Sequence, residues 1–386
     1  MKVAFISTLG HVSWGGSEAL WYETAKKALT EKHEVLTITH FFNDIPDKIK
    51  ELARLGAATH FMKGYDPAIT VRILRRLKNT IVKESEAEKL LKAFDPDVIV
   101  FNQCGAYEIT EMANFQRYLL SVNKPYYIIC HNYNETLVLT EEKRRILLNL
   151  FSKAKNVFMI CQLQLDTIMK QIVKRLPNVS LIDNPVNLQD VGPIKFPALD
   201  KVHFACVASF DVDRKGQDII FEVLSKEKWQ NRNWQLNIYG GGKDKKYLEQ
   251  LVSYFGIADK VIFKGHVQNI NAIWRENHLL LLSSRIETGP MVLTEAMLCG
   301  RPVVTTYVGR VPEVVKDGYN GFIAGAATAN LFDEALERAW QNKNQWESIG
   351  MQAYQTALNA VNLNAPETFL KVLLQAHLSS NNVVKI

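Results

Sequence analysis

Residues 183–200, DNPVNLQDVGPIKFPALD, interrupt a chain that otherwise alternates short apolar runs with helical segments. The stretch holds three prolines and a glycine, a composition typical of a linker. Apolar runs predict strands at 2–7, 34–39, 96–102, 125–131, 156–161 and 179–182 before it, and at 202–209, 236–240, 260–265, 279–284 and 302–308 after it. Because helical segments separate the strands, we expect parallel sheets covered on both faces, in two doubly wound, Rossmann-like α/β domains.

The expected domains are residues 1–187 and 188–365, followed by an amphipathic helix within 366–386 that we expect to cross back to the first domain. Open parallel sheets bind ligands beyond the carboxyl ends of their strands. We therefore expect the two domains to face a central cleft, with the functional residues at the ends of the predicted strands.

The composition excludes several classes of protein. The chain has 386 residues, of which 47% are hydrophobic and 22% charged, so disorder, collagen and coiled coil are excluded for the whole. A net charge of +6 is too small and too dispersed to indicate a nucleic-acid partner. No apolar stretch approaches the ~18 residues of a membrane span, and the first residues lack a signal-peptide core. Five scattered cysteines indicate reduced thiols in a cytoplasmic protein.

The strongest chemical signal is SSRIETGPMVLTEAMLCGRPVV, residues 283–304. Glu287 lies in the loop after a predicted strand, and Glu295 lies eight residues later, about one turn into the next helix. Carboxylates accept pairs of hydroxyl hydrogens, so two of them suit the ribose and the hexose of a nucleotide sugar. The alternative is that Glu295 complements the helix dipole and Glu287 is a solvated loop residue.

The start of that helix is the second part of the same signal. Gly289 suits a turn, and Pro290 suits the first helical position. The first-turn amides, Met291 and Val292 among them, have no partner within the helix and can bind an anion or a hydroxyl. The helix start therefore adds donors beside the two carboxylates.

A second stretch, VASFDVDRKGQDIIFEVL, residues 207–224, carries two adjacent cations, Arg214 and Lys215. Lys215 can neutralise the charge that develops on a departing diphosphate. Arg214 is either a second diphosphate ligand or a solvated loop residue. The tripeptide 211–213, Asp-Val-Asp, could ligate a metal but suits a turn better, and we expect no metal and no cofactor.

These motifs resemble those of glycosyltransferase family 4, the retaining glycosyl transferases group 1 of GT-B fold. The family carries an E-x7-E motif, often EGLPMVLLEAMACGKPVV, and a VARLxPxxKGQDLLLEAL stretch. The resemblance implies that Glu287 contacts the transferred sugar, that Glu295 holds the ribose, and that Lys215 binds the diphosphate. It also implies that the backbone near Val267 meets the base. The family's usual Arg is replaced by Ser209, which puts diphosphate affinity in question.

The first half adds WGGSEALW, residues 14–21, which resembles the family's GGxE loop. Gly15, Gly16 and Ser17 form either a simple turn or a phosphate loop for the donor or acceptor, and Ser17 is expected to cap the following helix. His131 follows a predicted strand, where a structural role is the common one. The resemblance implies instead that His131 contacts the transferred sugar.

The resemblance implies a retaining, metal-independent hexosyltransferase. Its donor is a nucleoside-diphosphate sugar, UDP- or GDP-linked, and its acceptor is a glycan or lipid-linked molecule of cell-surface polysaccharide synthesis. Two alternatives share the fold: a non-catalytic nucleotide-sugar or glycan-binding protein, and an epimerase or phosphorylase. A dinucleotide oxidoreductase is disfavoured because GxGxxG is absent.

One basic segment is relevant to membrane binding. Residues 72–83, RILRRLKNTIVK, carry five basic residues, no acidic one, and interleaved apolar residues. Such a segment suits either the surface of an anionic membrane or a surface helix docked by its apolar stripe. We therefore expect a cytoplasmic protein with an optional peripheral contact to the inner face of the membrane.

Overall fold

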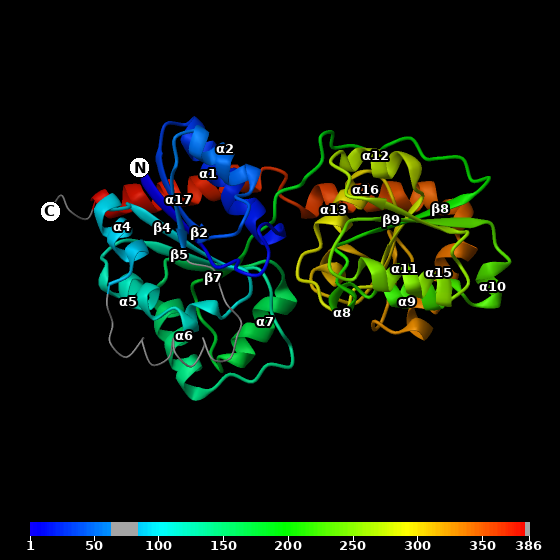
Figure 1. The fold of residues 1–386 in the computed structure, drawn as a ribbon, viewed down its shortest axis with the longest axis horizontal. Coiled ribbons are helices and arrows are strands. Elements are labelled where there is room, and N and C mark those ends of the chain that lie inside the picture. The colour runs from blue at the N-terminus through cyan, green and yellow to red at the C-terminus, as the bar shows by residue number, and fades with distance from the viewer. Residues whose placement is uncertain (63–83, 383–386) are drawn as a thin grey trace. The chain divides into compact units, whose positions relative to one another are not determined.

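The computed structural model describes residues 1–62 and 84–382, in two compact units. Unit 1 comprises residues 1–185 with the segment from 364 onward, and unit 2 comprises residues 186–363 (Figure 1). The basic segment 72–83 lies outside the described residues, so its membrane contact stays a prediction. The resemblance to glycosyltransferase family 4 also implies that residues 1–187 bind the acceptor and residues 188–365 bind the nucleotide sugar, and these roles stay predictions.

Unit 1 is built on a seven-stranded parallel sheet of order β3-β2-β1-β4-β5-β6-β7. Its strands are β1 (Lys2–Ser7), β2 (Glu34–His40), β3 (Ala58–Met62), β4 (Val98–Gln103), β5 (Tyr126–Cys130), β6 (Asn156–Met159) and β7 (Val179–Leu181). Its helices are η1 (Gly16–Glu18), α1 (Ala19–Thr30), α2 (Asp47–Arg54), α4 (Glu86–Phe94), η2 (Glu108–Glu111), α5 (Ala113–Ser121), α6 (Glu141–Lys153), α7 (Gln162–Gln171) and α17 (Ala365–Asn382).

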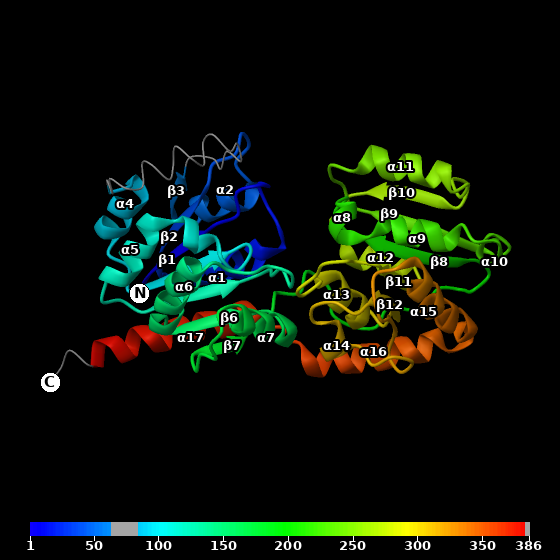
Figure 2. The ribbon, with the colours of Figure 1, turned by 90° about the horizontal axis from the view of Figure 1, so that it is seen from below.

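Helices cover both faces of this sheet, as the continuous apolar strands predict. Apolar residues of α1, α2 and α17 pack on one face, and those of α4 to α7 pack on the other. The C-terminal helix α17 lies beside α1, as Figure 2 shows from below. Phe369 of α17 contacts the rings of Tyr127 and Phe158 on neighbouring strands, so the end of the chain completes the core of unit 1.

Unit 2 repeats the design with a six-stranded parallel sheet of order β10-β9-β8-β11-β12-β13. Its strands are β8 (Val202–Val207), β9 (Trp234–Tyr239), β10 (Val261–Gly265), β11 (Leu279–Leu282), β12 (Val303–Thr306) and β13 (Phe322–Ala324). Its helices are α8 (Val212–Lys215), α9 (Gln217–Leu224), α10 (Glu227–Gln230), α11 (Lys245–Tyr254), α12 (Ile270–Glu276), α13 (Met291–Leu298), α14 (Val311–Val314), α15 (Ala329–Gln341), η3 (Lys343–Gln345) and α16 (Trp346–Ala360).

Two strands were not expected from the sequence, β3 and β13, and both lie at a sheet edge. β13 is only three residues long, and no residue of β3 is buried, so neither forms the apolar run that marks the inner strands. The prediction of two doubly wound parallel sheets is confirmed, and only the extent of each sheet was underestimated.

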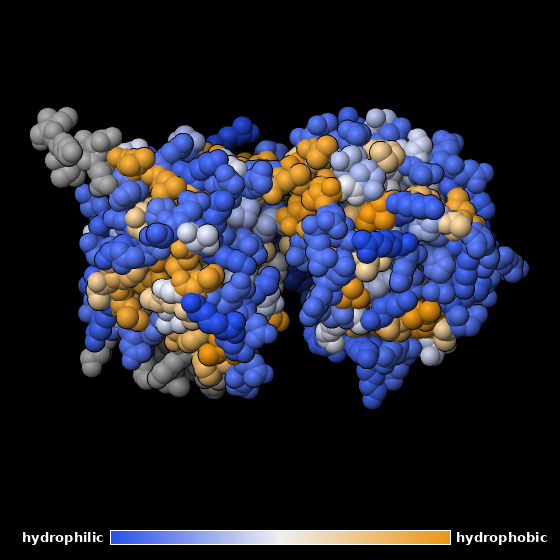
Figure 3. All heavy atoms as spheres, turned by 90° about the horizontal axis from the view of Figure 1, so that it is seen from above, coloured by the Kyte–Doolittle hydropathy of each residue, from blue (hydrophilic) through white to orange (hydrophobic). Residues whose placement is uncertain are grey.

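The surface carries no extended apolar belt on the face seen in Figure 3, where hydrophobic residues form separate small groups among hydrophilic ones. Among the described residues, no helix combines the length and the apolar character needed to cross a bilayer. Four of the five cysteines are buried, and Cys104 is half-buried.

Candidate functional site

The loop between β11 and α13 is held against the end of α8 by a very close backbone approach. Gly216, which follows α8, has φ +63°, and a Cβ atom there would lie 2.3 Å from the carbonyl oxygen of Ser283. The Ser283 hydroxyl donates to the Gly216 carbonyl at 2.6 Å. Only glycine fits this approach without strain, and it brings the end of α8 against the start of the loop.

This approach forms an ion pair between Lys215 and Glu287. Lys215 Nζ lies 2.6 Å from Glu287 Oε1, and the two side chains are only 17% and 10% exposed. The Ser284 hydroxyl donates to the same oxygen at 3.0 Å. Within the part of the chain that the structure describes, these are the polar partners of the Glu287 carboxylate, and both engage Oε1. The second oxygen, Oε2, keeps its capacity to accept hydrogen bonds.

The backbone of this loop is held from behind as well. Gly309 has φ +49°, and a Cβ there would lie 2.2 Å from the Thr288 carbonyl oxygen and 2.6 Å from that of Glu287. The amide of Arg310 donates to the Thr288 carbonyl at 2.7 Å. The loop that carries Glu287 is therefore fixed on two sides by glycines with positive φ.

Helix α13 begins directly after the loop, without a side-chain cap. Pro290 occupies the N-cap position, where its carbonyl accepts the amide of Leu293 at 3.1 Å but its side chain provides no acceptor for the amides of Met291 and Val292. Gly289, Met291 and Val292 are half-buried at this helix start. Uncapped first-turn amides and the positive end of the helix dipole favour an anion or a hydroxyl oxygen.

Glu295 lies one turn into α13 and is buried, with 5% of its surface exposed. Burial raises the pKa of Glu295 to about 7, while a hydrogen bond from the backbone N–H of Asn187 acts in the opposite direction. A carboxyl group that is desolvated and has one protein donor is well suited to accept ligand hydroxyls.

The remaining predicted donor-binding residues have less specific surroundings. Ser209 is exposed, and its carbonyl accepts a hydrogen bond from Gln217 Nε2 at 2.8 Å. The carbonyl of Arg214 accepts the amides of Arg285 and Ile286 at 2.8 and 3.1 Å, while its side chain is half-buried. The backbone of Arg214 therefore helps to anchor the Glu287 loop, whichever role its guanidinium has.

Two further predictions concern unit 2. Val267 is partly buried and packs against the hydrophobic cluster that contains Leu293 and Val311, a contact that suits a core role for its side chain. In the Asp-Val-Asp tripeptide, Asp211 pairs with Lys243 at 3.1 Å. Within residues 1–62 and 84–382, no three His, Cys, Asp or Glu side chains gather as metal ligands do.

In unit 1 the buried carboxyl group of Glu18 accepts several side-chain hydrogen bonds at the start of α1. It accepts from Ser7 Oγ at 3.0 Å, Ser17 Oγ at 3.2 Å, Trp21 Nε1 at 2.9 Å and Asn102 Nδ2 at 3.3 Å. Burial raises the pKa of Glu18 to about 7, and the bonds from Ser7, Trp21 and Ser17 oppose that shift.

The prediction that Ser17 caps the helix is wrong. The 3₁₀ turn over Gly16–Glu18 precedes α1, Gly15 is its N-cap, and neither helix has a side-chain cap. The Ser17 hydroxyl turns to its neighbour Glu18 instead. Ser17 Oγ is therefore committed to Glu18 in this structure, and any phosphate contact of the Gly15–Ser17 loop would be made by backbone amides.

His131 lies at the carboxyl end of β5 and is 8% exposed. Its Nε2 lies 2.8 Å from Asn102 Oδ1, and burial lowers the pKa of the imidazole to about 3. Sequence analysis did not single out Asn102, although a polar residue ending the apolar run VIVFN is the signal that could have indicated it. The structure thus joins His131, Asn102 and Glu18 in one buried cluster.

A family model, that of the glycosyl transferases group 1, matches residues 195–356, nearly all of unit 2. N-acetyl-alpha-D-glucosaminyl L-malate synthase of Bacillus anthracis is 35% identical over 104 residues, which are 27% of this chain and 27% of that protein. The chain matches at most 38% of the length of this relative and the two that follow it.

Solved structures extend the likeness to the whole chain. HepE of Anabaena in complex with UDP has a TM-score of 0.72 at 17% identity, covering 97% of this chain and 100% of HepE. The lipopolysaccharide outer core galactosyltransferase WaaB, in its apo form, has a TM-score of 0.68 at 21% identity, covering 98% of this chain and 100% of WaaB. At this identity the likeness establishes the fold, which is GT-B.

Proposed function

We propose that this chain, which belongs to the glycosyl transferases group 1 family, is a retaining glycosyltransferase that moves a sugar from a nucleoside-diphosphate donor to a glycan or lipid-linked acceptor. Unit 2 binds the donor, and unit 1 binds the acceptor and supplies His131. The UDP in the HepE complex supports a UDP-sugar donor. The galactosyltransferase named for the lipopolysaccharide outer core supports an acceptor of cell-surface polysaccharide synthesis.

The observation that carries the proposal is the Lys215–Glu287 pair beside the uncapped start of α13. A diphosphate needs cations and N–H donors, and a sugar needs carboxylate acceptors, and both kinds of group occur here. In the absence of a ligand the cation and the carboxylate neutralise each other. When a donor binds, Lys215 exchanges Glu287 for the diphosphate, and Glu287 is released to accept sugar hydroxyls.

The chemical step follows from the same groups. Lys215 and the amides of the α13 start stabilise the negative charge that builds on the departing diphosphate. The sugar passes through an oxocarbenium-like state, and the acceptor hydroxyl attacks from the face that the diphosphate leaves. The departing phosphate takes the acceptor's proton, so no protein carboxylate is required as a covalent nucleophile, and the anomeric configuration is retained.

Glu295 has a different role, in binding rather than in charge stabilisation. Its buried carboxyl group accepts hydroxyls of the donor's ribose, which replaces lost hydration by well-placed hydrogen bonds. Its protein partner is the backbone of Asn187, in the segment that follows the first unit. A ribose on Glu295 therefore contacts a carboxyl that is also bonded to the connecting segment.

A second candidate is a protein that binds a nucleotide sugar or a glycan without transferring it. The observation that favours it is the small, exposed Ser209 at the position of the family's arginine, which leaves Lys215 without a second strong cation from that position. The two candidates differ in turnover and not in donor binding.

The test combines binding with product analysis. A thermal-shift panel of UDP-, GDP-, ADP- and dTDP-sugars should show one sugar that raises the melting temperature well above its bare nucleotide, because ligands stabilise the state they bind. Transfer or slow hydrolysis of that donor, with retention of the anomer and loss in Glu287→Ala, supports the enzyme. Binding without any turnover in the pure protein supports the second candidate.

The matched control is Lys226→Ala. Lys226 pairs with Asp333 at 2.8 Å in the same unit, so its loss also breaks a Lys–carboxylate pair. Turnover that survives this change but not Glu287→Ala assigns the effect to the site.

A further inference from the structure

Three neighbouring strands of unit 1 end in polar residues on one face of the sheet. Alternate side chains of a strand share a face, and partners in register lie side by side. The rows that face α1 and α17 run Val3, Phe5, Ser7 on β1, then Val98, Val100, Asn102 on β4, then Tyr127, Ile129, His131 from β5. Each row is apolar until its last member, so a small polar cluster forms where the sheet meets the start of α1.

Asn102 lies at the centre of this cluster, and its amide has one possible orientation. Its Nδ2 donates to the backbone carbonyl of Ser17 at 3.1 Å and to Glu18 Oε1 at 3.3 Å. A backbone carbonyl only accepts hydrogen bonds, so the atom facing Ser17 must be the NH₂ group. Oδ1 is then the atom that faces His131.

That orientation decides which nitrogen of His131 carries the proton. An amide oxygen only accepts, so His131 Nε2, 2.8 Å away, must be the donor. Burial keeps the ring neutral, because it lowers the pKa of the imidazole to about 3. A neutral ring with its proton on Nε2 has an unprotonated Nδ1, which can accept a hydrogen bond.

The main chain holds the base of the same side chain. The amide of His131 donates to the carbonyls of Gln103 and Gly105 at 3.2 and 3.1 Å. With the backbone held at one end and Nε2 bonded at the other, the ring has one orientation, and Nδ1 has one direction.

We infer that Asn102 is a positioning residue that holds His131 in its neutral Nε2–H tautomer, so that Nδ1 is kept as an acceptor for a hydroxyl of the ligand. Ser17 and Glu18 act through Asn102, because they hold its amide in the required orientation. The identity of the hydroxyl, one on the transferred sugar, rests on the proposed function, whereas the tautomer does not.

The end of the Gly15–Ser17 loop thereby has a second role. The carbonyl of Ser17 is one of the two groups that orient Asn102, so the conformation of this loop is coupled to the acceptor atom of His131. A ligand that moves the loop would release Asn102 and with it the tautomer.

The test is a long-range ¹H–¹⁵N correlation spectrum of the full chain, labelled on its nine histidines and assigned with His131→Asn. We expect His131 to show a protonated Nε2 that exchanges slowly with solvent and an unprotonated Nδ1. In Asn102→Leu the acceptor is gone, so we expect exchange of the Nε2 proton to accelerate by at least about tenfold, which corresponds to ~1.4 kcal/mol. A protonated Nδ1 in the parent protein, or unchanged exchange in Asn102→Leu, overturns the inference.

Asn102→Asp keeps the proposal testable if the leucine variant does not fold. An aspartate at this position can still accept from Nε2 through one oxygen, while its other oxygen, protonated because it faces the Ser17 carbonyl and the Glu18 carboxyl group, donates to them. We therefore expect the Nε2–H tautomer and its slow exchange to be kept, and a protonated Nδ1, or exchange as fast as in a variant without an acceptor, contradicts the contact. The control is Asn237→Leu, since Asn237 is also a buried strand asparagine, bonded to Asn277 at 2.8 Å in unit 2, and its loss should leave His131 unchanged.

Turnover separates this inference from the proposed function. If the enzyme transfers sugar, Asn102→Leu should lower kcat/KM, and Asn102→Asp, which keeps an acceptor for Nε2, should retain part of it. If no donor turns over in any variant, the proposed function fails while the tautomer measurement still decides the role of Asn102.

Discussion

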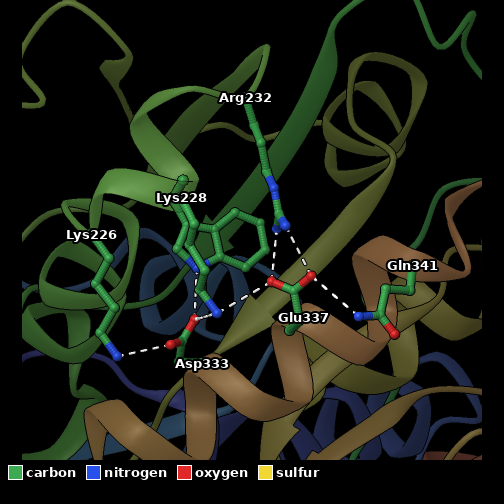
Figure 4. Close-up of polar contacts among 7 residues, drawn as sticks. Lys226, Lys228, Arg232, Asp333, Glu337 and Gln341 are labelled. Carbon is green, nitrogen blue, oxygen red and sulfur yellow. Dashed lines mark hydrogen bonds and ion pairs between the residues drawn. The ribbon is translucent and has the colours of Figure 1, made fainter.

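Two of the Lys–carboxylate pairs in unit 2 differ in what surrounds them. Lys215 and Glu287 pair at 2.6 Å, and Lys226 and Asp333 pair at 2.8 Å. The first pair borders an uncapped helix start and leaves one carboxylate oxygen without a protein partner among the described residues. The second belongs to a network in which the carboxylates are fully engaged (Figure 4).

That network joins α10 and the segments beside it to α15. Asp333 accepts from Lys226, from Lys228 at 2.9 Å, and from the buried indole Nε1 of Trp229 at 2.7 Å. Both of its oxygens therefore have donors. The indole N–H is satisfied by the same carboxylate that the two lysines neutralise.

Glu337, one turn further along α15, completes the network. Arg232 donates to both of its oxygens at 2.9 Å, a bidentate geometry that fixes the guanidinium. The same guanidinium lies 4.3 Å from the ring centroid of Trp229. Donors, acceptors and aromatic faces are all matched here, so the network can stabilise the fold but has little capacity left for a ligand.

This comparison shows that a short ion pair does not by itself identify a ligand-binding site. Among the described residues, Lys215 and Glu287 differ in having a carboxylate oxygen without a protein partner and a neighbouring helix start without a side-chain cap, in a loop held by close backbone contacts at two glycines. Groups that can exchange a protein partner for a ligand can contribute to binding. Groups whose hydrogen-bond partners all lie within the protein contribute to stability instead.

The largest expected difference is in turnover. Lys215→Ala should lower kcat/KM for sugar transfer by about 100-fold or more, on the scale of an oxyanion-hole donor at ~3 kcal/mol, because the charge on the departing diphosphate loses its cation. Steady-state kinetics with the donor found by thermal shift measures it. Near-normal turnover in both Lys215→Ala and Glu287→Ala would break the comparison.

The next expected effect concerns the backbone that forms the site. Gly216→Ala must either strain φ +63° or move the Ser283 carbonyl, since the new Cβ would lie 2.3 Å from it. We expect a loss of ~2 kcal/mol in the free energy of unfolding, together with a fall in turnover. Chemical denaturation and kinetics on the same preparation measure both. Gly256→Ala is the control, because Gly256 has a similar φ of +65° but nothing within 4 Å of its Cβ position.

Asp333→Ala should show the opposite profile. It leaves the buried Trp229 N–H without its acceptor and should cost ~2 kcal/mol of stability, while kcat/KM stays within about twofold of the parent. Denaturation and kinetics again decide. A loss of turnover without a loss of stability would mean that the network, not the Lys215–Glu287 pair, belongs to the site.

The last expected difference is in pH dependence. Burial raises the pKa of Glu295 from 4.5 to about 7, so the folded chain holds a proton that the unfolded chain releases, and stability falls as pH rises from about 4.5 to about 7. Burial also acts to raise the pKa of Asp333, but bonds from Lys226, Lys228 and Trp229 outweigh it and lower the value below 3.8. Its contribution is therefore present above pH 3.8 and lost as pH falls through the folded pKa.

Denaturation at a series of pH values separates the two carboxyl groups. Glu295→Gln should remove a dependence of the free energy of unfolding on pH of up to ~1.4 kcal/mol per pH unit between about 4.5 and 7. Asp333→Asn should reduce the pH dependence of that free energy only at acid pH, below about 3.8. Glu18 shares the direction of Glu295, since burial raises its pKa to about 7, and Glu18→Gln is the matched variant in unit 1. A parent protein whose stability rises steadily from pH 4.5 to 7 would contradict the raised pKa values.

Local pattern carried most of the fold. The continuous apolar strands and the helical segments between them predicted both doubly wound sheets, because burial on two faces demands that pattern. The pattern fails where no residue of a strand is buried, as in β3, and where a strand has only three residues, as in β13. It also failed at Ser17, whose hydroxyl donates to the buried Glu18 carboxyl group instead of accepting from a helix amide.

The pattern of apolar runs in the sequence was enough to predict two α/β halves. Its motifs identified the candidate functional residues Lys215, Glu287, Glu295 and His131. Only the tertiary structure decided which groups meet. Lys215 and Glu287 are 72 residues apart and pair because Gly216 allows the end of α8 to approach the loop that carries Glu287. Asn102 and His131 are 29 residues apart and meet because their strands are neighbours in the sheet. Periodicity specifies faces and ends of elements, whereas hydrogen-bond partners depend on packing between elements that are distant in the chain.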